Sequence, residues 1–207
     1  MYETDVDRYC YPGTKVLRNR AGLRLQSELD KFEAIMVKEQ STKPLPTGRL
    51  SVSHYRAIHR HLFGPVYVWA GRYRTVRMTK GTSQFCHPDF IEPNMKKLFV
   101  SLEDENFFRD LLPDDFARGA AHFLAELNAI HPFREGNGRT QNTFLILLSY
   151  DGGHPLDLSR LGLLEPRRML EAMIAGFNGE EQPLSSLIVT LMRGRYLEQL
   201  AATADPV

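Results

Sequence analysis

The segment of residues 131–142, HPFREGNGRTQN, concentrates groups that are suited to phosphoryl chemistry. His131 is the one side chain in it that exchanges a proton near neutral pH, so we expect it to act as the general base for an attacking hydroxyl. Glu135 offers a carboxylate to Mg²⁺, which prefers one or two carboxylates together with substrate oxygens. We therefore expect an active site in this segment.

The glycine-rich turn in the same segment is suited to hold phosphate groups. Successive backbone N–H groups of Gly136, Asn137 and Gly138 can form an anion-binding nest, and a following helix would add the partial positive charge of its N-terminus. Arg139 would neutralise the charge that Mg²⁺ leaves on the phosphates, and Phe133 is expected to point inward as an anchor. Such turns also occur in loops without chemistry, so spacing alone leaves a purely structural loop open.

This segment resembles the signature of the Fic family, H-x-F-x-[D/E]-G-N-G-R-x-x-R, at every position except the last. The resemblance implies a protein adenylyltransferase that moves AMP from ATP to a hydroxyl side chain of a target protein, with Mg²⁺ on Glu135. In the family, the last arginine contacts the terminal phosphate of ATP and is covered by an inhibitory glutamate. This chain has Asn142 there, which can hydrogen-bond a phosphate but carries no charge. Natural divergence, a slower enzyme and an engineered change all remain open explanations.

Two helices are expected to position the segment, as a catalytic helix-loop-helix over residues 114–150. Pro113 and the two aspartates after it are typical of a helix start. Apolar residues then recur every three or four positions and predict a buried stripe of Phe116, Ala120, Phe123, Leu127 and Ile130. The second helix contains TFLILLSY, which is apolar nearly all round and indicates burial on several sides before Gly152-Gly153 ends it.

One β-hairpin is predicted, with strands at residues 73–78 and 84–87 and a turn between them. Its sequence, RTVRMTKGTSQFCHP, resembles the flap of Fic proteins, a hairpin that lies over the active site and pairs with the backbone of the target. The resemblance implies target contacts for Lys80, Gly81 and Thr82. The predicted fold is therefore mainly α, a single Fic-type helical bundle over residues 1–207 with one hairpin flap, the flap segment being residues 73–87.

Further helices are predicted at residues 27–39, 53–63, 89–105, 166–177 and 183–200. The first would open with Ser27-x-x-Asp30 as a variant capping box. Its buried face is expected to consist of Leu29, Phe32, Ile35 and Met36.

Three histidines, His54, His59 and His61, fall in the second of these helices. His59 and His61 are two residues apart and so lie on different faces, and the chain has no H-E-x-x-H pattern. We therefore expect solvent-facing histidines rather than a metal site. Trp69, the one tryptophan, is expected to anchor the core.

Length and composition are typical of a folded, soluble protein of one domain. Lys and Arg number 26 against 25 Asp and Glu, so no overall field favours nucleic acid or an anionic membrane as a partner. No apolar run approaches the roughly 20 residues of a membrane span. Cys10 and Cys86 are far apart, and the N-terminus shows no secretory segment, so free thiols in a cytoplasmic chain are expected.

The N-terminal arm, residues 1–24, is expected to be irregular but to lie against the core. Its sequence YCYPGTKVLRNRAGL resembles the N-terminal segment of stand-alone bacterial Fic toxins. That resemblance implies a toxin whose target is a type II topoisomerase B subunit, with host GTPases as competing targets. SLEDEN, at residues 101–106, fits the pattern of the family's inhibitory helices but lies between the flap and the catalytic helices, so we interpret it as coincidence. Inhibition is expected from a separate small antitoxin.

Two other functions stay open at this point. A kinase, as in the related Doc toxins, would bind ATP reversed and transfer the γ-phosphate, although Doc-type motifs lack the complete GNGR turn. Asn142 also leaves open a catalytically weakened module that binds a nucleotide or a partner without chemistry.

Overall fold

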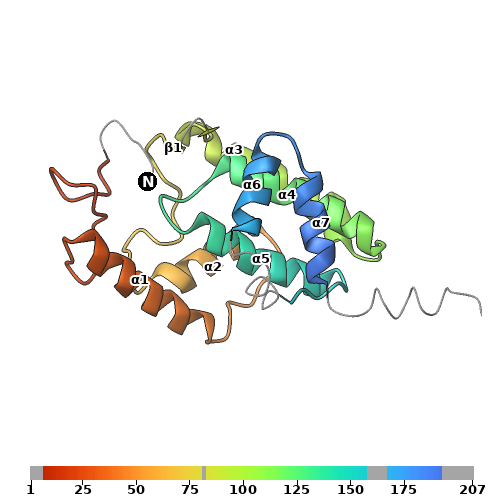
Figure 1. The fold of residues 1–207 in the computed structure, drawn as a ribbon, viewed down its shortest axis with the longest axis horizontal. Helices are drawn as coiled ribbons and strands as arrows, with labels where there is room; N and C mark the ends of the chain where they lie inside the picture. The colour runs from red at the N-terminus through yellow and green to blue at the C-terminus, as the bar shows by residue number, and fades with distance from the viewer. Residues whose placement is uncertain (1–6, 81–82, 158–166, 193–207) are drawn as a thin grey trace, which may run out of the picture. The chain divides into compact units, whose positions relative to one another are not determined.

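The computed structural model describes residues 7–80, 83–157 and 167–192, and most of these residues are helical (Figure 1). In chain order the elements are α1 (Gln26–Ser41), α2 (Val52–Phe63), β1 (Thr79–Lys80), β2 (Ser83–Gln84), α3 (Pro88–Asp104), the 3₁₀ helix η1 (Asn106–Phe108), α4 (Pro113–Ile130), α5 (Asn137–Asp151), α6 (Arg168–Phe177) and α7 (Gln182–Leu191). None of the described helices is long and apolar enough to cross a bilayer. The prediction of a mainly α fold is confirmed.

The chain forms two compact units that alternate along the sequence. The first comprises Met1–Phe99 and Ala129–Phe144, and the second comprises Val100–Asn128 and Leu145–Val207. Helices α3, α4 and α5 each begin in one unit and end in the other. The segment with the predicted chemistry, residues 131–142, lies wholly within the first unit.

In the first unit, α1 packs against α2. The residue before α1 is Leu25, whose side chain makes no capping bond, and Asp30 instead accepts a hydrogen bond from Gln26 within the helix. The predicted capping box is therefore wrong. Leu29 and Val37, two helical turns apart, are buried, whereas Ile35 is 62% exposed and points off their face. The burial predicted for Ile35 is also wrong.

Helix α2 buries Tyr55, Ile58 and Leu62, as predicted. The prediction of solvent-facing histidines is wrong, because His54 and His59 are buried in this helix. The reason is that backbone carbonyls of packed segments offer hydrogen-bond acceptors: His54 bonds the carbonyl of Pro46 at 2.7 Å. Trp69 is buried, as predicted, and both cysteines are free thiols.

The hairpin is shorter than predicted, and its strands lie closer to the turn: β1 occupies Thr79 and Lys80, which were predicted as turn residues, and β2 begins one residue earlier than predicted. Thr79 pairs with Gln84 and Lys80 with Ser83 in antiparallel register, while residues 73–78 and 85–87 lie outside any strand. A buried arginine explains the difference, since its guanidinium takes up carbonyls that a strand would pair. Arg74 donates at 2.6 to 3.2 Å to the carbonyls of Val76, Cys86, Ile130 and His131. Gly81 and Thr82, which were predicted to contact the target, lie outside the described residues.

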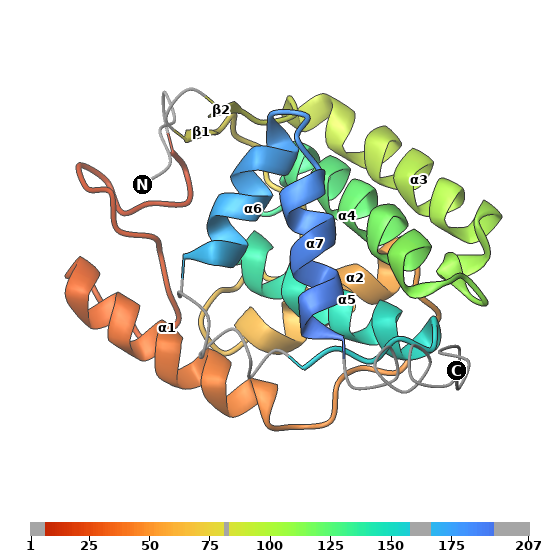
Figure 2. The same cartoon turned by 45° about the vertical axis from the view of Figure 1, so that its right-hand side comes forward.

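The helices that flank the loop of residues 131–136 form as predicted. Helix α4 begins at Pro113, and every residue of its predicted stripe is buried. On α5, Phe144, Leu145 and Leu148 have no exposed surface. In the second unit, α6 and α7 lie side by side (Figure 2). The last two predicted helices, residues 166–177 and 183–200, correspond to α6 and α7. Residue 166 of the first and residues 193–200 of the second lie outside the described residues.

Candidate active site

Residues 131–136 form the short loop that joins α4 to α5. The chain turns sharply at both ends of this loop, because His131 has φ +48° and Gly136 has φ +83°. A side chain on Gly136 would lie 2.4 Å from ring carbons of Phe63. Only glycine suits this position, since it tolerates positive φ and lets the loop approach that ring.

His131 begins the loop directly after α4 and is only 4% exposed. Its ring stacks on the ring of Phe85, which follows β2, with centroids 3.9 Å apart. Its backbone carbonyl accepts a hydrogen bond from Arg74 Nε at 2.7 Å. The positive φ of His131 and its stacking on Phe85 together fix the direction of the imidazole. The imidazole thus lies next to the residues that follow the hairpin.

Asn137 closes the loop on itself. Its side-chain oxygen accepts from the backbone N–H of Phe133 at 2.9 Å, and its side-chain amide donates to the carbonyl of Phe133 at 2.7 Å. The Phe133 ring is fully buried and stacks on the rings of Tyr55 and His59. The side chain of Asn137 is thus used inside the loop, while its backbone N–H has no acceptor among the described residues.

His59 attaches this loop to α2. Its Nδ1 accepts from the backbone N–H of Gly71 at 2.8 Å, so its Nε2 carries the proton and donates to the carbonyl of Glu135 at 2.9 Å. Burial lowers the pKa of His59 from 6.5 to about 4. The imidazole is therefore neutral at physiological pH, and both of its nitrogens hold backbone in place.

Glu135 has one carboxylate oxygen engaged and the other available. Oε1 accepts from the backbone N–H of Gly136 at 2.8 Å and from Arg139 Nη2 at 3.3 Å. No described residue donates to Oε2, and the side chain is 29% exposed. The carboxylate is thus oriented by two donors while it keeps an oxygen for a further ligand.

Of the predicted nest of Gly136, Asn137 and Gly138, the Gly136 N–H already donates to Glu135 Oε1, so the available backbone donors begin at Asn137, at the N-terminus of α5. The N–H groups of Asn137, Gly138 and Arg139 have no acceptor among the described residues, as is usual in the first turn of a helix. Gly138 is exposed and has open space where a side chain would be. Aligned N–H groups at the positive end of a 15-residue helix suit an anion.

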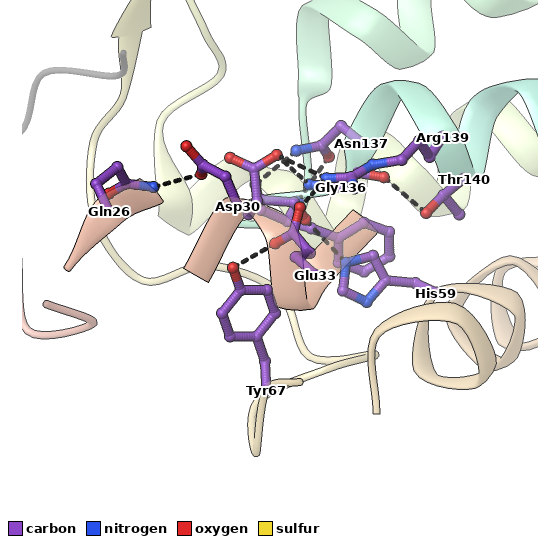
Figure 3. A network of polar contacts seen from close by, with 11 residues as sticks. Gln26, Asp30, Glu33, His59, Tyr67, Gly136, Asn137, Arg139 and Thr140 are labelled. Atoms are coloured by element: carbon purple, nitrogen blue, oxygen red, sulfur yellow. Dashed lines mark hydrogen bonds and ion pairs between the residues drawn. The ribbon is translucent and has the colours of Figure 1, made fainter. Parts of the chain in front are cut away.

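Arg139 lies next to Glu33 (Figure 3), and it also contacts the carboxylate of Glu135 and the ring of Phe63. Its Nη2 is 2.5 Å from Glu33 Oε1 on α1, and its guanidinium lies over the ring of Phe63 at 4.6 Å from the centroid. Tyr67 donates its hydroxyl to the other oxygen of Glu33. The arginine expected to meet phosphate is thus part of a network that extends back to α1.

Of the remaining predicted site residues, Lys80 lies in β1 and Asn142 is half-buried on α5. The loop is also tied to the N-terminal arm, because Arg134 donates to Asp7 Oδ2 at 2.5 and 2.7 Å. Sequence reasoning missed Glu33 and His59, although a signal existed. Each lies four residues after an apolar residue that is buried, on the same helix face.

Comparison with known proteins identifies the family of this chain. The model of the Fic/DOC family matches residues 49–149. The chain is 49% identical over 188 residues to "Probable protein adenylyltransferase y4lH" of Sinorhizobium fredii, covering 90% of this chain and 96% of that protein. It is 35% identical to "Protein adenylyltransferase VbhT" of Bartonella schoenbuchensis over 90% of this chain, and it spans 39% of that longer protein.

A solved structure agrees as well. The BepC protein of Bartonella tribocorum, with bound AMPPNP, superposes with a TM-score of 0.80 at 26% identity, over 90% of this chain and 97% of that chain. Three findings support one assignment: 49% identity over nearly the whole of the Sinorhizobium fredii relative, the fold shared with BepC, and the family match over the loop. The chain belongs to the Fic/DOC family.

Proposed function

We propose that this protein is an ATP-dependent protein adenylyltransferase that transfers AMP to a hydroxyl side chain of a target protein. The observation that carries the proposal is the loop between α4 and α5. It holds a buried histidine at one end, an oriented carboxylate at Glu135 and three unengaged N–H groups at the start of α5. Relatives named as protein adenylyltransferases support the same reaction.

Each residue of the loop and of the start of α5 has a separate task in the reaction. The N–H groups of Asn137, Gly138 and Arg139 hold the phosphates, and the Arg139 guanidinium offsets their charge. His131 takes the proton from the target hydroxyl while its oxygen forms a bond to the α-phosphorus. The bond from that phosphorus to the bridging oxygen breaks, pyrophosphate leaves, and AMP stays on the target.

The residues fit a magnesium ion bound together with the nucleotide. Glu135 offers Oε2, and the described residues contain no group of three or more His, Cys, Asp and Glu that would hold a metal without substrate. Mg²⁺ commonly takes one or two carboxylates and completes its shell with phosphate oxygens and water. When bound, it would neutralise charge on the phosphates.

The target and the regulation belong to the same proposal. We infer a type II topoisomerase B subunit as the target and a toxin activity, supported by the likeness of the N-terminal arm to stand-alone bacterial Fic toxins. The hairpin of β1 and β2 would hold the target segment, and we infer target contacts for Lys80, Gly81 and Thr82 from the likeness of the segment to the Fic flap. A separate antitoxin would supply inhibition.

The test is transfer from ATP labelled at either the α- or the γ-phosphate, with purified gyrase as the acceptor. Label on the B subunit from the α position only is the expected result, because the reaction retains the α-phosphate and expels the other two. Transfer from the γ position alone would instead identify a kinase. Transfer to other proteins of a bacterial lysate but not to gyrase would reject the proposed target and keep the reaction.

His131→Ala is the matched control in the same assay. Loss of a general base typically lowers the rate by roughly 10² to 10⁴ while ATP binding persists. Transfer at the wild-type rate in this variant would remove His131 from the chemistry.

A further inference from the structure

Glu33 of α1 contacts the phosphate-binding arginine from outside the segment that carries the family signature. Its Oε1 lies 2.5 Å from Arg139 Nη2, and its Oε2 accepts the hydroxyl of Tyr67. The Glu33 side chain is 12% exposed, and that of Arg139 is 39% exposed. The carboxylate is thus partly shielded from water, and both of its oxygens are engaged (Figure 3).

Tyr67 makes this carboxylate a fixed partner. Its ring is 1% exposed and stacks on Trp69 with centroids 4.5 Å apart. Burial and the charge of Glu33 raise the pKa of Tyr67 far above its ordinary value, so the hydroxyl stays protonated and donates. A buried donor of fixed direction limits how far the Glu33 side chain can turn.

The two carboxylates engage Nη2 of Arg139 and leave its other guanidinium donors, Nε and Nη1, for a ligand. Nη2 donates both to Glu33 and to Glu135, at 2.5 and 3.3 Å. Nε and Nη1 have no acceptor among the described residues. Because the guanidinium is planar, fixing Nη2 between two carboxylates and placing the plane over the Phe63 ring also fixes where the other donors point.

Glu33 and Glu135 both bind Arg139, but only Glu135 is also expected to bind the cation. Under the proposed function, Glu135 also offers Oε2 to the cation, so its carboxylate has a second task besides the bond from Arg139 to Oε1. Glu33 has no such task and can hold Arg139 throughout the reaction. The family model begins at residue 49, so α1 lies outside the matched segment.

We propose that Glu33 is a positioning residue for AMP transfer: with Tyr67 it holds Arg139 so that the free edge of the guanidinium faces the phosphates, which makes α1 part of the nucleotide site. This inference rests on the proposed function. It predicts an effect on the chemical step rather than on ATP affinity, because removing the carboxylate loosens Arg139 but also removes a negative charge near the phosphates.

The test compares Glu33→Gln with wild type in ATP binding by calorimetry and in the rate of AMP transfer. Glutamine keeps the length of the side chain and an oxygen acceptor but loses the charge. We expect kcat to fall about tenfold, a loss typical of a displaced catalytic group, while the Kd for ATP changes less than about threefold. Asp30→Asn is the matched control, because Asp30 is an exposed carboxylate on the same helix, and its one side-chain hydrogen bond among the described residues is the one it accepts from Gln26.

Tyr67→Phe supplies a second arm that keeps the ring and removes only the hydroxyl. If Tyr67 acts through Glu33, the double variant has no lower kcat than Glu33→Gln alone, which is the non-additivity of residues in one network. Full additivity of the two losses would separate Tyr67 from Glu33 and overturn their joint role. Thermal unfolding of each variant shows whether the fold is kept.

An unchanged or raised kcat in Glu33→Gln overturns the role of Glu33 and leaves the proposed function standing. A raised kcat would identify Glu33 as a competitor of the phosphates for Arg139. Failure of wild-type protein to bind ATP and to transfer label from the α position would overturn the proposed function, and this inference with it.

Discussion

Asn142 follows Arg139 by three residues on α5, so the two positions are neighbours on the helix surface. An arginine at position 142 would reach toward the same phosphates and add a charge-assisted hydrogen bond, which an uncharged, shorter asparagine cannot make. We expect Asn142→Arg to raise AMP transfer roughly tenfold, since such bonds contribute about 1.5–3 kcal/mol. The rate at saturating ATP measures this effect.

The same substitution should also make an antitoxin more effective, because its glutamate gains a cation to pair with. Inhibition is measured as the antitoxin concentration that halves the rate, with Asn142→Gln as the uncharged control. If rate, ATP affinity and inhibition all stay at wild-type values in the arginine variant, position 142 does not face the phosphates.

Single residues near the site show which roles could be predicted from the sequence. His131 and Glu135 stand within one short motif, so their proximity follows from the chain itself. Glu33 and His59 act through partners 106 and 76 residues away, Arg139 and the Glu135 carbonyl. Helical spacing places Glu33 and His59 on the apolar faces of their helices. A polar residue on such a face reveals its role only when the residue it contacts is known.

At the scale of elements, α2 holds the loop between α4 and α5 through His59. The His59 imidazole accepts a hydrogen bond from the Gly71 N–H at Nδ1 and donates one from Nε2 to the carbonyl of Glu135. The same ring stacks on Phe133 with centroids 3.8 Å apart. The position of the loop of residues 131–136 therefore depends on a helix far away in the sequence.

Two substitutions separate these contacts. In His59→Gln the side-chain amide reaches the position of Nε2 and can still donate to Glu135, whereas in His59→Asn the side-chain oxygen replaces Nδ1 and keeps only Gly71. Both lose the stacked ring. We expect kcat/KM to be about tenfold lower in the asparagine variant than in the glutamine variant, because an unmade buried bond costs about 1–3 kcal/mol. Equal activities at equal stability would show that the Glu135 contact does not position the loop.

The helices were predictable because their signals are local. The stripe of α4 and the apolar length of α5 depend on spacing within one segment, so each helix formed near its predicted bounds. The hairpin was misplaced because Arg74 donates to the carbonyls of Ile130 and His131, more than 50 residues away. No property of residues 73–78 alone indicates that interaction.

At the scale of the whole molecule, the chain divides into two compact units, and every contact described for the site lies within the first. Trp69, the single tryptophan, belongs to that unit and is buried there. Its fluorescence therefore reports the unfolding of the unit that carries the loop of residues 131–136.

The acid stability of this unit should depend on His59. Burial lowers the pKa of His59 to about 4 in the folded protein, against 6.5 in the unfolded chain. Above pH 6.5 neither state binds a proton there, and the neutral ring contributes its full stability. As the pH falls from 6.5 toward 4, the unfolded state takes up the proton first, so the free energy of unfolding decreases by about 3 kcal/mol, 1.36 kcal/mol for each pKa unit.

Urea unfolding followed by Trp69 fluorescence at pH 7, 6, 5 and 4 measures this loss. His59→Gln cannot be protonated, so we expect it to be less stable than wild type at pH 7 but to lose less stability toward pH 4. Carboxylates titrate in the same range in both proteins, and the difference between the two curves removes their contribution. Parallel curves would mean that His59 is protonated equally in the folded and unfolded states. The folded protein would then not hold this imidazole neutral below pH 6.5.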